Sequence, residues 1–314
     1  MLLAVLLAGC APAPPTGIAA TPSLAWRRVA DIPTPRSEVA AAVHGGLVIV
    51  IGGFGGANVV EAYLPQQDRW LALGQLPVGV DHAMAAATVS VGSAASHVYL
   101  MGGNVSGVAS ARVFRGTVSA PGGIMWEEVA AMPGPRSQGA AVAVGTKIYV
   151  VGGASGDRLA APTYEYDAIL DTWRAVAAIP TPRDHLSAAE LGGRVCAVGG
   201  RRLSLLQNLS TLECYDPAGE AWSKLPDAPT ARGGVGAAVV GSRLVFVGGE
   251  QPLGTFREVE IFDQVTGRWS RGPDLPTPRH GLGVVAVGGT VYVMSGGPTP
   301  GGSQTAVCEA LDVR

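Results

Sequence analysis

Residues 171–200 read DTWRAVAAIPTPRDHLSAAELGGRVCAVGG, and most of the chain repeats this pattern. The stretch contains Trp173, a Pro-x-Pro-Arg step ending at Arg183, a small apolar run, a glycine turn, and a second apolar run that closes on the pair Gly199-Gly200. The interval from tryptophan to the first glycine of the pair is 26 residues in four copies, 27 in the last and 32 in the second. The six copies begin at Trp26, Trp70, Trp126, Trp173, Trp222 and Trp269, and they close on Gly52-Gly53, Gly102-Gly103, Gly152-Gly153, Gly199-Gly200, Gly248-Gly249 and Gly296-Gly297.

The period of the repeat predicts the fold. Successive glycine pairs are 47 to 50 residues apart, and the copies consist of short apolar runs and turns without helical periodicity. This spacing is typical of a propeller blade of four antiparallel strands. We therefore expect an all-β, six-bladed propeller.

The repeat resembles the kelch family over residues 24–314. The shared features are the Pro-x-x-Arg or Pro-x-Pro-Arg entry, the glycine pair, a Glu-x-aromatic-Asp step such as residues 213–216, and the tryptophan about six residues later. Kelch repeats occur in enzymes and in binding scaffolds, so the resemblance implies the fold more strongly than a function.

The two ends of the chain are expected to complete one blade. The C-terminal copy holds only three predicted strands, within residues 280–287, 291–295 and 307–313, and the missing outer strand with its tryptophan is found at residues 26–32. Pairing of these ends closes the ring and leaves few exposed strand edges.

The N-terminus predicts export. Residues 2–7 are apolar but too few to span a bilayer, and Leu7-Ala8-Gly9-Cys10 resembles the bacterial lipobox, in which the cysteine is lipidated after cleavage. An ordinary secretory signal is the alternative, and no basic residue precedes the apolar run. We predict three segments: a lipoprotein-type signal over 1–10 with lipidation at Cys10, a flexible Pro/Ala/Thr-rich tether over 11–23, and the propeller over 24–314.

Charge limits the partners. The formal net charge is -2 and only 15% of residues are charged, which argues against a nucleic acid or an anionic membrane surface. The expected contact with a membrane is the lipid anchor alone, and the expected state is a monomer.

Function is expected on one face of the ring. The entry segments and the segments after the glycine pairs lie at the same ends of their strands, and the latter vary while the strands do not. These variable segments are residues 54–58, 104–110, 154–162, 201–209, 250–256 and 298–304.

Arginine occupies the entry position in five copies. A ring of guanidinium groups at a channel mouth would suit a carboxylate, sulfate or acidic sugar. The alternative is that these arginines bond the blades or loops together, because arginine belongs to the kelch repeat itself. The residues are Arg36, Arg136, Arg183, Arg232 and Arg279.

The second copy departs from the others. We place Asp81 at its entry position and Arg112 where four copies have glutamate (Glu61, Glu213, Glu260 and Glu309). Reversal at both positions would follow if the two residues form an ion pair, whereas drift of this longer copy explains the change without one.

Three histidines, His82, His185 and His280, follow the entry position in alternate copies. Convergent imidazoles could bind a transition metal, but their offset varies by one residue, and we predict neither metal nor cofactor. His44 and His97 are expected at the opposite face. Further rim groups are Glu38, Asp184, Glu250, Arg201 and Arg202.

The remaining cysteines leave two readings open. Cys196 and Cys214 are predicted on neighbouring strands and could form a disulfide in an oxidising compartment; otherwise these two and Cys308 are small buried residues.

No catalytic motif is present, so we favour an exported, lipid-anchored binding scaffold whose loop face contacts a glycan, a peptide or an envelope partner. The alternative is an enzyme on an acidic sugar, resembling the sialic acid mutarotases, with arginine holding the acid group and histidine or glutamate moving a proton. A resemblance to copper radical oxidases is disfavoured because the cysteines lie within strand runs. The ligand-binding candidates are Arg36, Asp81, His82, Arg136, Arg183, His185, Arg201, Arg232, Glu250, Arg279 and His280.

Overall fold

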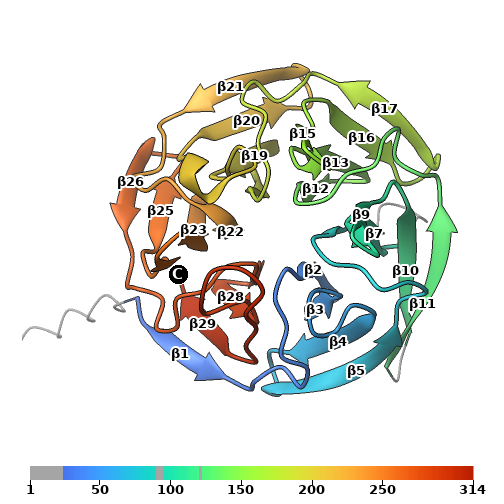
Figure 1. Cartoon of the computed structure of the whole chain (residues 1–314), viewed down its shortest axis with the longest axis horizontal. Coiled ribbons are helices and arrows are strands. Elements are labelled where there is room, and N and C mark those ends of the chain that lie inside the picture. Colours follow the sequence, from blue (N-terminus) through green and yellow to red (C-terminus); the bar gives the residue numbers. More distant parts are fainter. Residues whose placement is uncertain (1–23, 90–94, 120–121, 314) are drawn as a thin grey trace, which may run out of the picture.

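The computed structural model describes residues 24–89, 95–119 and 122–313. These residues form six four-stranded antiparallel sheets arranged as blades around a central axis (Figure 1). The predicted all-β, six-bladed propeller is therefore confirmed. The predicted signal, tether and lipidation site at Cys10 lie outside the described residues.

In blades 1 to 5 the strands are arranged from the axis outward in chain order. Blade 1 contains β2 (Ala40–His44), β3 (Leu47–Ile51), β4 (Val59–Leu64) and β5 (Arg69–Gln75). Blade 2 contains β6 (Met84–Ala87), β7 (Val98–Met101), β10 (Val113–Ser119) and β11 (Gly123–Val129). Blade 3 contains β12 (Ala140–Val144), β13 (Lys147–Val151), β16 (Thr163–Asp167) and β17 (Thr172–Val176).

Blades 4 and 5 repeat this arrangement. Blade 4 contains β18 (Ser187–Leu191), β19 (Arg194–Val198), β20 (Leu212–Asp216) and β21 (Ala221–Leu225). Blade 5 contains β22 (Gly233–Val240), β23 (Arg243–Gln251), β25 (Glu260–Asp263) and β26 (Arg268–Arg271).

Blade 6 joins the two ends of the chain. Its strands are β27 (Gly283–Val287), β28 (Thr290–Met294), β29 (Cys308–Asp312) and, from the N-terminus, β1 (Trp26–Val29). The register of β1 against β29 pairs Trp26 with Leu311 and Val29 with Cys308. The predicted closure is confirmed.

The core lies between the blades. The second strand of each blade is almost continuously apolar and buried, as in β3, where Val48 to Ile51 are 0% exposed. Because each blade packs both faces against its neighbours, no alternation with polar residues is tolerated there. The inner strands carry the expected small residues, since the space at the axis is narrow.

The tryptophans join neighbouring blades. The indole of Trp26 in blade 6 donates to the carbonyl of Pro273 at the end of blade 5, at 2.9 Å. Equivalent bonds to the preceding blade are made by Trp70, Trp173, Trp222 and Trp269. Trp126 has no such partner among the residues that the structure describes. The recurrence of tryptophan at the start of the outer strand predicts that these rings pack between blades, and five of them also form a hydrogen bond there.

The glycine pairs occupy left-handed backbone conformations. Gly52 and Gly53 have φ of 62° and 94°, and a Cβ at Gly53 would lie 2.4 Å from the carbonyl oxygen of Ser37. In the last blade the equivalent positions are Ser295 (φ 61°) and Gly296, not the predicted Gly296-Gly297. Ser295 is fully buried and its hydroxyl donates to the carbonyl of Arg36, a bond that offsets the cost of the left-handed conformation.

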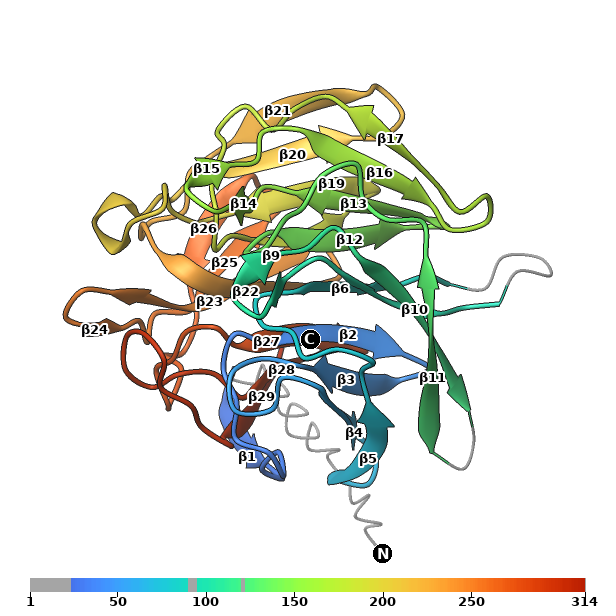
Figure 2. The same ribbon diagram turned by 45° about the vertical axis from the view of Figure 1, so that its right-hand side comes forward.

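Two faces of the ring are distinguished below. The loop face carries the entry segments and the segments after the glycine pairs; the turn face carries the turns such as Gly45-Gly46. Short elements rise from the loop face: β8 (Asn104–Val105) with β9 (Val108–Ala109), β14 (Ala154–Ser155) with β15 (Arg158–Leu159), η1 (Leu205–Gln207) and β24 (Gly254–Thr255). Figure 2 shows β24 and the loop that carries β15 projecting on the same side of the ring.

Candidate functional site

The entry arginines do not face the channel. The side chain of Arg183 is fully buried, and its guanidinium lies 2.6 Å from the Glu213 carboxylate and donates to the carbonyls of Gly199 and Ala197. Arg36, Arg232 and Arg279 form the same pair with the glutamate of their own blade. In blade 3, Arg136 instead stacks on the Tyr164 ring, 4.5 Å from its centroid.

Burial lowers the pKa of all five arginines, to about 10 for Arg136 and Arg232, which leaves them charged at neutral pH. Their charge and donors are used inside the blades. Of the two roles considered above, the structure favours bonding within the frame, and the arginines contribute no ligand-facing group at the mouth.

The entry residue of the second copy is Val80, and Arg112 lies two residues before the position of the glutamate. The amide of the second glycine in each pair donates to the carbonyl of the next blade's entry residue, and for Gly53 this acceptor is Val80, not Asp81. Valine therefore replaces arginine in blade 2. Asp81 bonds His82 and Asn104, while Arg112 pairs with the exposed Glu128, so the proposed Asp81–Arg112 pair is wrong. Blade 2 has neither residue of the buried pair, because Phe114 occupies the register position that Glu61 occupies in blade 1.

The inner strands do not begin directly after the arginine, except in blade 5. In the other blades three residues intervene, and the second of them is left-handed. These residues and Gly234 form an inner ring at the loop-face mouth: Glu38, His82, Gln138, His185, Gly234 and Gly281, with φ from 51° to 71°.

Backbone hydrogen bonds run around the inner ring. The amide of His82 donates to the carbonyl of Glu38, Gln138 donates to His82, and His185 donates to Gln138, at 3.1, 3.0 and 2.7 Å. Gly234, Gly281 and then Val39 continue the series back to the start. This belt holds one residue of each blade beside the axis and so positions the candidate site.

Three side chains of the inner ring converge. Nε2 of His82 lies 3.3 Å from Oε2 of Glu38, and the rings of His82 and His185 are edge to face with centroids 5.2 Å apart. Aspartates orient both imidazoles: Nδ1 of His82 bonds Asp81 at 2.6 Å, and Nδ1 of His185 bonds Asp184 at 2.5 Å. Two of the three predicted histidines thus meet, together with Glu38.

His280 belongs to a different position of its blade. It lies one residue nearer to the arginine than His82 and His185 do, and its side chain is buried. Its Nδ1 contacts Oε1 of Glu38 at 3.0 Å and its Nε2 contacts the Thr299 carbonyl at 3.1 Å. Burial opposes protonation of His280, but the Glu38 carboxylate outweighs it and raises the pKa of this ring, which favours donation from both nitrogens and positions Glu38.

The charges of this cluster are mutually dependent. Burial alone would raise the pKa of Glu38, but His82, His185 and His280 hold it well below its usual range. Burial likewise opposes protonation of His82, while Glu38 and Asp81 outweigh that effect and raise its pKa. For His185 burial prevails and the pKa is lowered.

A second network links the loops outside the ring. Arg201 lies 2.8 Å from Glu250 and 3.7 Å from Asp184, and Glu250 accepts from the Gly301 amide. Arg202 is exposed beside them. The predicted rim candidates Arg201 and Glu250 therefore bond each other and brace neighbouring loops.

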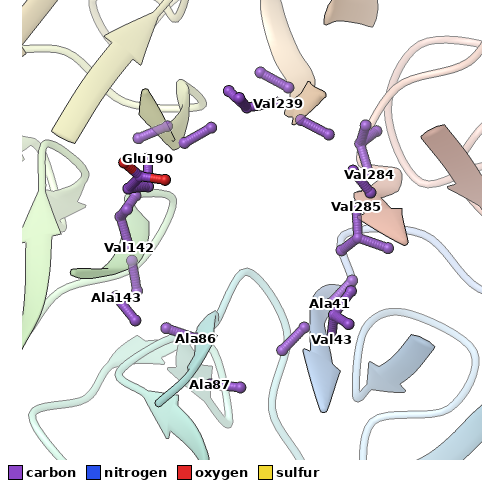
Figure 3. A pocket seen from close by; sticks show the side chains of 17 residues that line it. Ala41, Val43, Ala86, Ala87, Val142, Ala143, Glu190, Val239, Val284 and Val285 are labelled. Atoms are coloured by element: carbon purple, nitrogen blue, oxygen red, sulfur yellow. The ribbon is translucent and has the colours of Figure 1, made fainter. Parts of the chain in front are cut away.

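The channel itself is apolar. Its turn-face end is a cavity of about 330 Å³ lined by alanine and valine from the inner strands of all six blades, with Glu190 the acidic side chain on its wall (Figure 3). The cavity at the loop-face mouth, inside the inner ring, is only about 80 Å³. Small-molecule sites are typically about 300–1,000 Å³ and carry convergent polar groups. Within residues 24–89, 95–119 and 122–313, neither of these two cavities is lined by an arginine, whereas the enzyme alternative predicts an arginine-lined sugar pocket.

Exposed apolar side chains stand on the loop face. Leu206 of η1 is 83% exposed and Leu253, beside β24, is 98% exposed. The two loops are joined, since the side-chain Nδ2 of Asn208 donates to the backbone carbonyl of Glu250 at 2.8 Å. Val108 of β9 and Leu203 are further exposed apolar residues on this face. They provide contact area of the kind that protein interfaces use.

The structure decides between the two readings of the cysteines. Cys196 and Cys214 form a disulfide between directly paired residues of β19 and β20, whereas Cys308 is a buried thiol. His44 and His97 lie at the turn ends of their strands, as expected.

Two family models match the chain. The KLHDC2/KLHL20/DRC7 kelch-repeats domain matches residues 82–297, and the kelch motif matches residues 35–77. The chain belongs to the kelch-repeat family, whose propellers are typical of protein-interaction scaffolds.

A curated relative is similar to part of the propeller. Beta-scruin of Limulus polyphemus is 29% identical over 156 residues, which cover 44% of this chain and 16% of that protein. The match thus spans a small part of the relative. Among the described residues, none of the helices combines the length and apolar character needed to cross a membrane.

Proposed function

We propose that this chain is an exported, lipid-anchored interaction scaffold that binds a protein or peptide partner through its loop face. The observation that carries the proposal is the pair of almost fully exposed leucines, Leu206 and Leu253, at the tips of two neighbouring loops. Aliphatic side chains held out on a rigid frame lose little freedom on binding and bury apolar area.

The position of the first described residues supports the anchoring part of the proposal. Leu24 lies beside Arg243 and Thr266, at the turn-face end of blade 5. A tether of residues 11–23 would reach at most about 45 Å from there. Attachment through Cys10 would therefore leave the loop face directed away from the membrane.

A comparison of matched variants tests the partner. Leu206→Asp with Leu253→Asp removes the apolar tips, whereas Val265→Asp changes a residue that is 82% exposed on the turn face. Cross-linking and capture from envelope extracts should recover a partner with the wild type and the Val265 variant but not with the double variant. Equal recovery by all three chains would exclude the loop tips.

Two further measurements test the lipid anchor and the alternative of a glycan ligand. Cys10→Ser should move the chain from the membrane fraction to the soluble exported fraction; an unchanged distribution would contradict lipidation. A thermal-shift screen of acidic sugars and polysaccharides should give no stabilisation, and a saturable shift that Leu206→Asp leaves intact would replace the protein partner by a glycan.

A further inference from the structure

We propose that the inner ring holds a divalent transition metal such as Zn²⁺, bound by Nε2 of His82, Nε2 of His185 and the carboxylate of Glu38. The three residues come from blades 2, 4 and 1. They each offer one ligand atom, and these atoms lie within 4.8 Å of one another. The inference is independent of the partner proposed above.

The ligand chemistry suits a transition metal. Two imidazoles and one carboxylate form the set that binds zinc or non-haem iron in many sites. Ligand atoms around a four-coordinate zinc ion are about 3.3–3.5 Å apart, given zinc–nitrogen and zinc–oxygen distances near 2.0–2.2 Å. The His82–Glu38 separation of 3.3 Å already meets this value, and the ligand atom of His185 lies within 4.8 Å of the other two.

The hydrogen bonds around the cluster place two acceptor atoms opposite each other, and a cation between them would satisfy both. Because Asp81 only accepts, Nδ1 of His82 must donate to it, which leaves Nε2 facing a Glu38 oxygen. In the neutral tautomer two acceptors then oppose each other at 3.3 Å, an arrangement that requires either a second proton or a metal between them.

The surroundings resemble those of histidine metal sites. A metal-binding histidine usually donates its other ring N–H to a carboxylate, which orients the ring and strengthens the ligand. Asp81 and Asp184 do this for His82 and His185. The other oxygen of Glu38 is held by His280 at 3.0 Å.

The site is also accessible and has space for water. The three ligands line the mouth cavity of about 80 Å³, and a water molecule occupies about 30 Å³. Room exists partly because two members of the ring are glycines: a Cβ at Gly281 would lie 2.4 Å from Oε1 of Glu38. The metal would keep an open position toward the loop face.

Calorimetry and equilibrium dialysis of the full, untagged chain with Zn²⁺ test the proposal. The wild type should bind one equivalent, and His82→Ala and His185→Ala should each weaken binding by more than 100-fold. Asp81→Asn, which removes only an orienting carboxylate, should weaken it about 10–100-fold. His97→Ala, near the opposite face, is the matched control and should bind like the wild type.

If a variant fails to fold, two measurements on the wild type still test the proposal. Co²⁺ bound at this site should give a visible absorption spectrum of four- or five-coordinate geometry, and Zn²⁺ should raise the melting temperature. The proposal is overturned by absence of stoichiometric binding in the wild type, by unchanged binding in the folded His82 and His185 variants, or by equal loss in His97→Ala. Any of these results would leave a proton between His82 and Glu38.

Discussion

The Arg183 guanidinium lies 2.6 Å from the Glu213 carboxylate, and their side chains are 0% and 3% exposed. The same pair recurs in blades 1, 5 and 6, in each case between the entry segment and the third strand of the blade. A charge this far from water is tolerated only while its partner remains in place.

Glu213→Gln should therefore destabilise the propeller by about 3–5 kcal/mol, because it leaves the buried Arg183 without a counter-charge. Urea unfolding measures the change. Glu128→Gln, in the exposed pair with Arg112, is the control and should cost less than about 1 kcal/mol. Equal effects of the two substitutions would show that the buried pair does not support the blade.

Trp26→Phe should cost about 1 kcal/mol, because it keeps an aromatic ring but removes the hydrogen bond to Pro273 that joins blades 5 and 6. Trp126→Phe removes an N–H that has no partner and should be close to neutral. Thermal or urea unfolding compares the two. The assigned role of Trp26 in ring closure fails if the second substitution is as costly as the first.

Cys196→Ala together with Cys214→Ala should lower the unfolding free energy by about 2–4 kcal/mol, since the bond constrains the unfolded chain. Reductant should destabilise the wild type and have no effect on the double variant. Mass measurement without reductant should show two hydrogens fewer than the reduced chain. In a chain that lacks residues 1–23, and therefore Cys10, a free-thiol count of three in the folded, unreduced protein would contradict the bond.

Acidification should destabilise the ring in part through Asp68. The Ala30 amide and the Tyr63 hydroxyl bond this carboxylate and lower its pKa in the folded state. The unfolded chain then binds a proton at higher pH, near 3.9, so the contribution is present above about pH 5 and is lost as the pH falls through the lower, folded pKa.

Unfolding measured between pH 6 and pH 3 should therefore show a shallower decline for Asp68→Asn than for the wild type. Parallel curves for the two chains would remove Asp68 from the acid response. The bond is of structural interest because Ala30 follows β1, so the same carboxylate helps to hold the N-terminal strand against blade 1.

Much of the architecture was predictable because it follows from a repeated local pattern. A four-stranded unit with two apolar faces cannot bury them alone, so six such units imply a ring, and a tryptophan strand at one end with three strands at the other implies closure. The packing role of the tryptophans followed from the same regularity. One-residue errors arose where the pattern was least regular, at Val80 in blade 2 and at Ser295 in blade 6.

The site was predictable only in part. The sequence places His82, His185 and Glu38 at the mouth of the channel, but it gives the entry arginines an equal claim to bind a ligand there. Their partners are carbonyls and glutamates brought by strands up to 30 residues away, and no spacing rule indicates that such a side chain turns into the blade. The inner ring did have a signal in the sequence, because its members lie two residues after the arginine in each of the five blades that have one.

Six blades, their closure and the face that carries the variable loops were thus implied by the order of residues alone, because each follows from burial of short apolar runs. The tertiary structure decided which groups meet at the axis. Convergence of Glu38, His82 and His185 depends on a left-handed residue in each blade and on a belt of hydrogen bonds between blades, and these contacts exist only once the ring has closed.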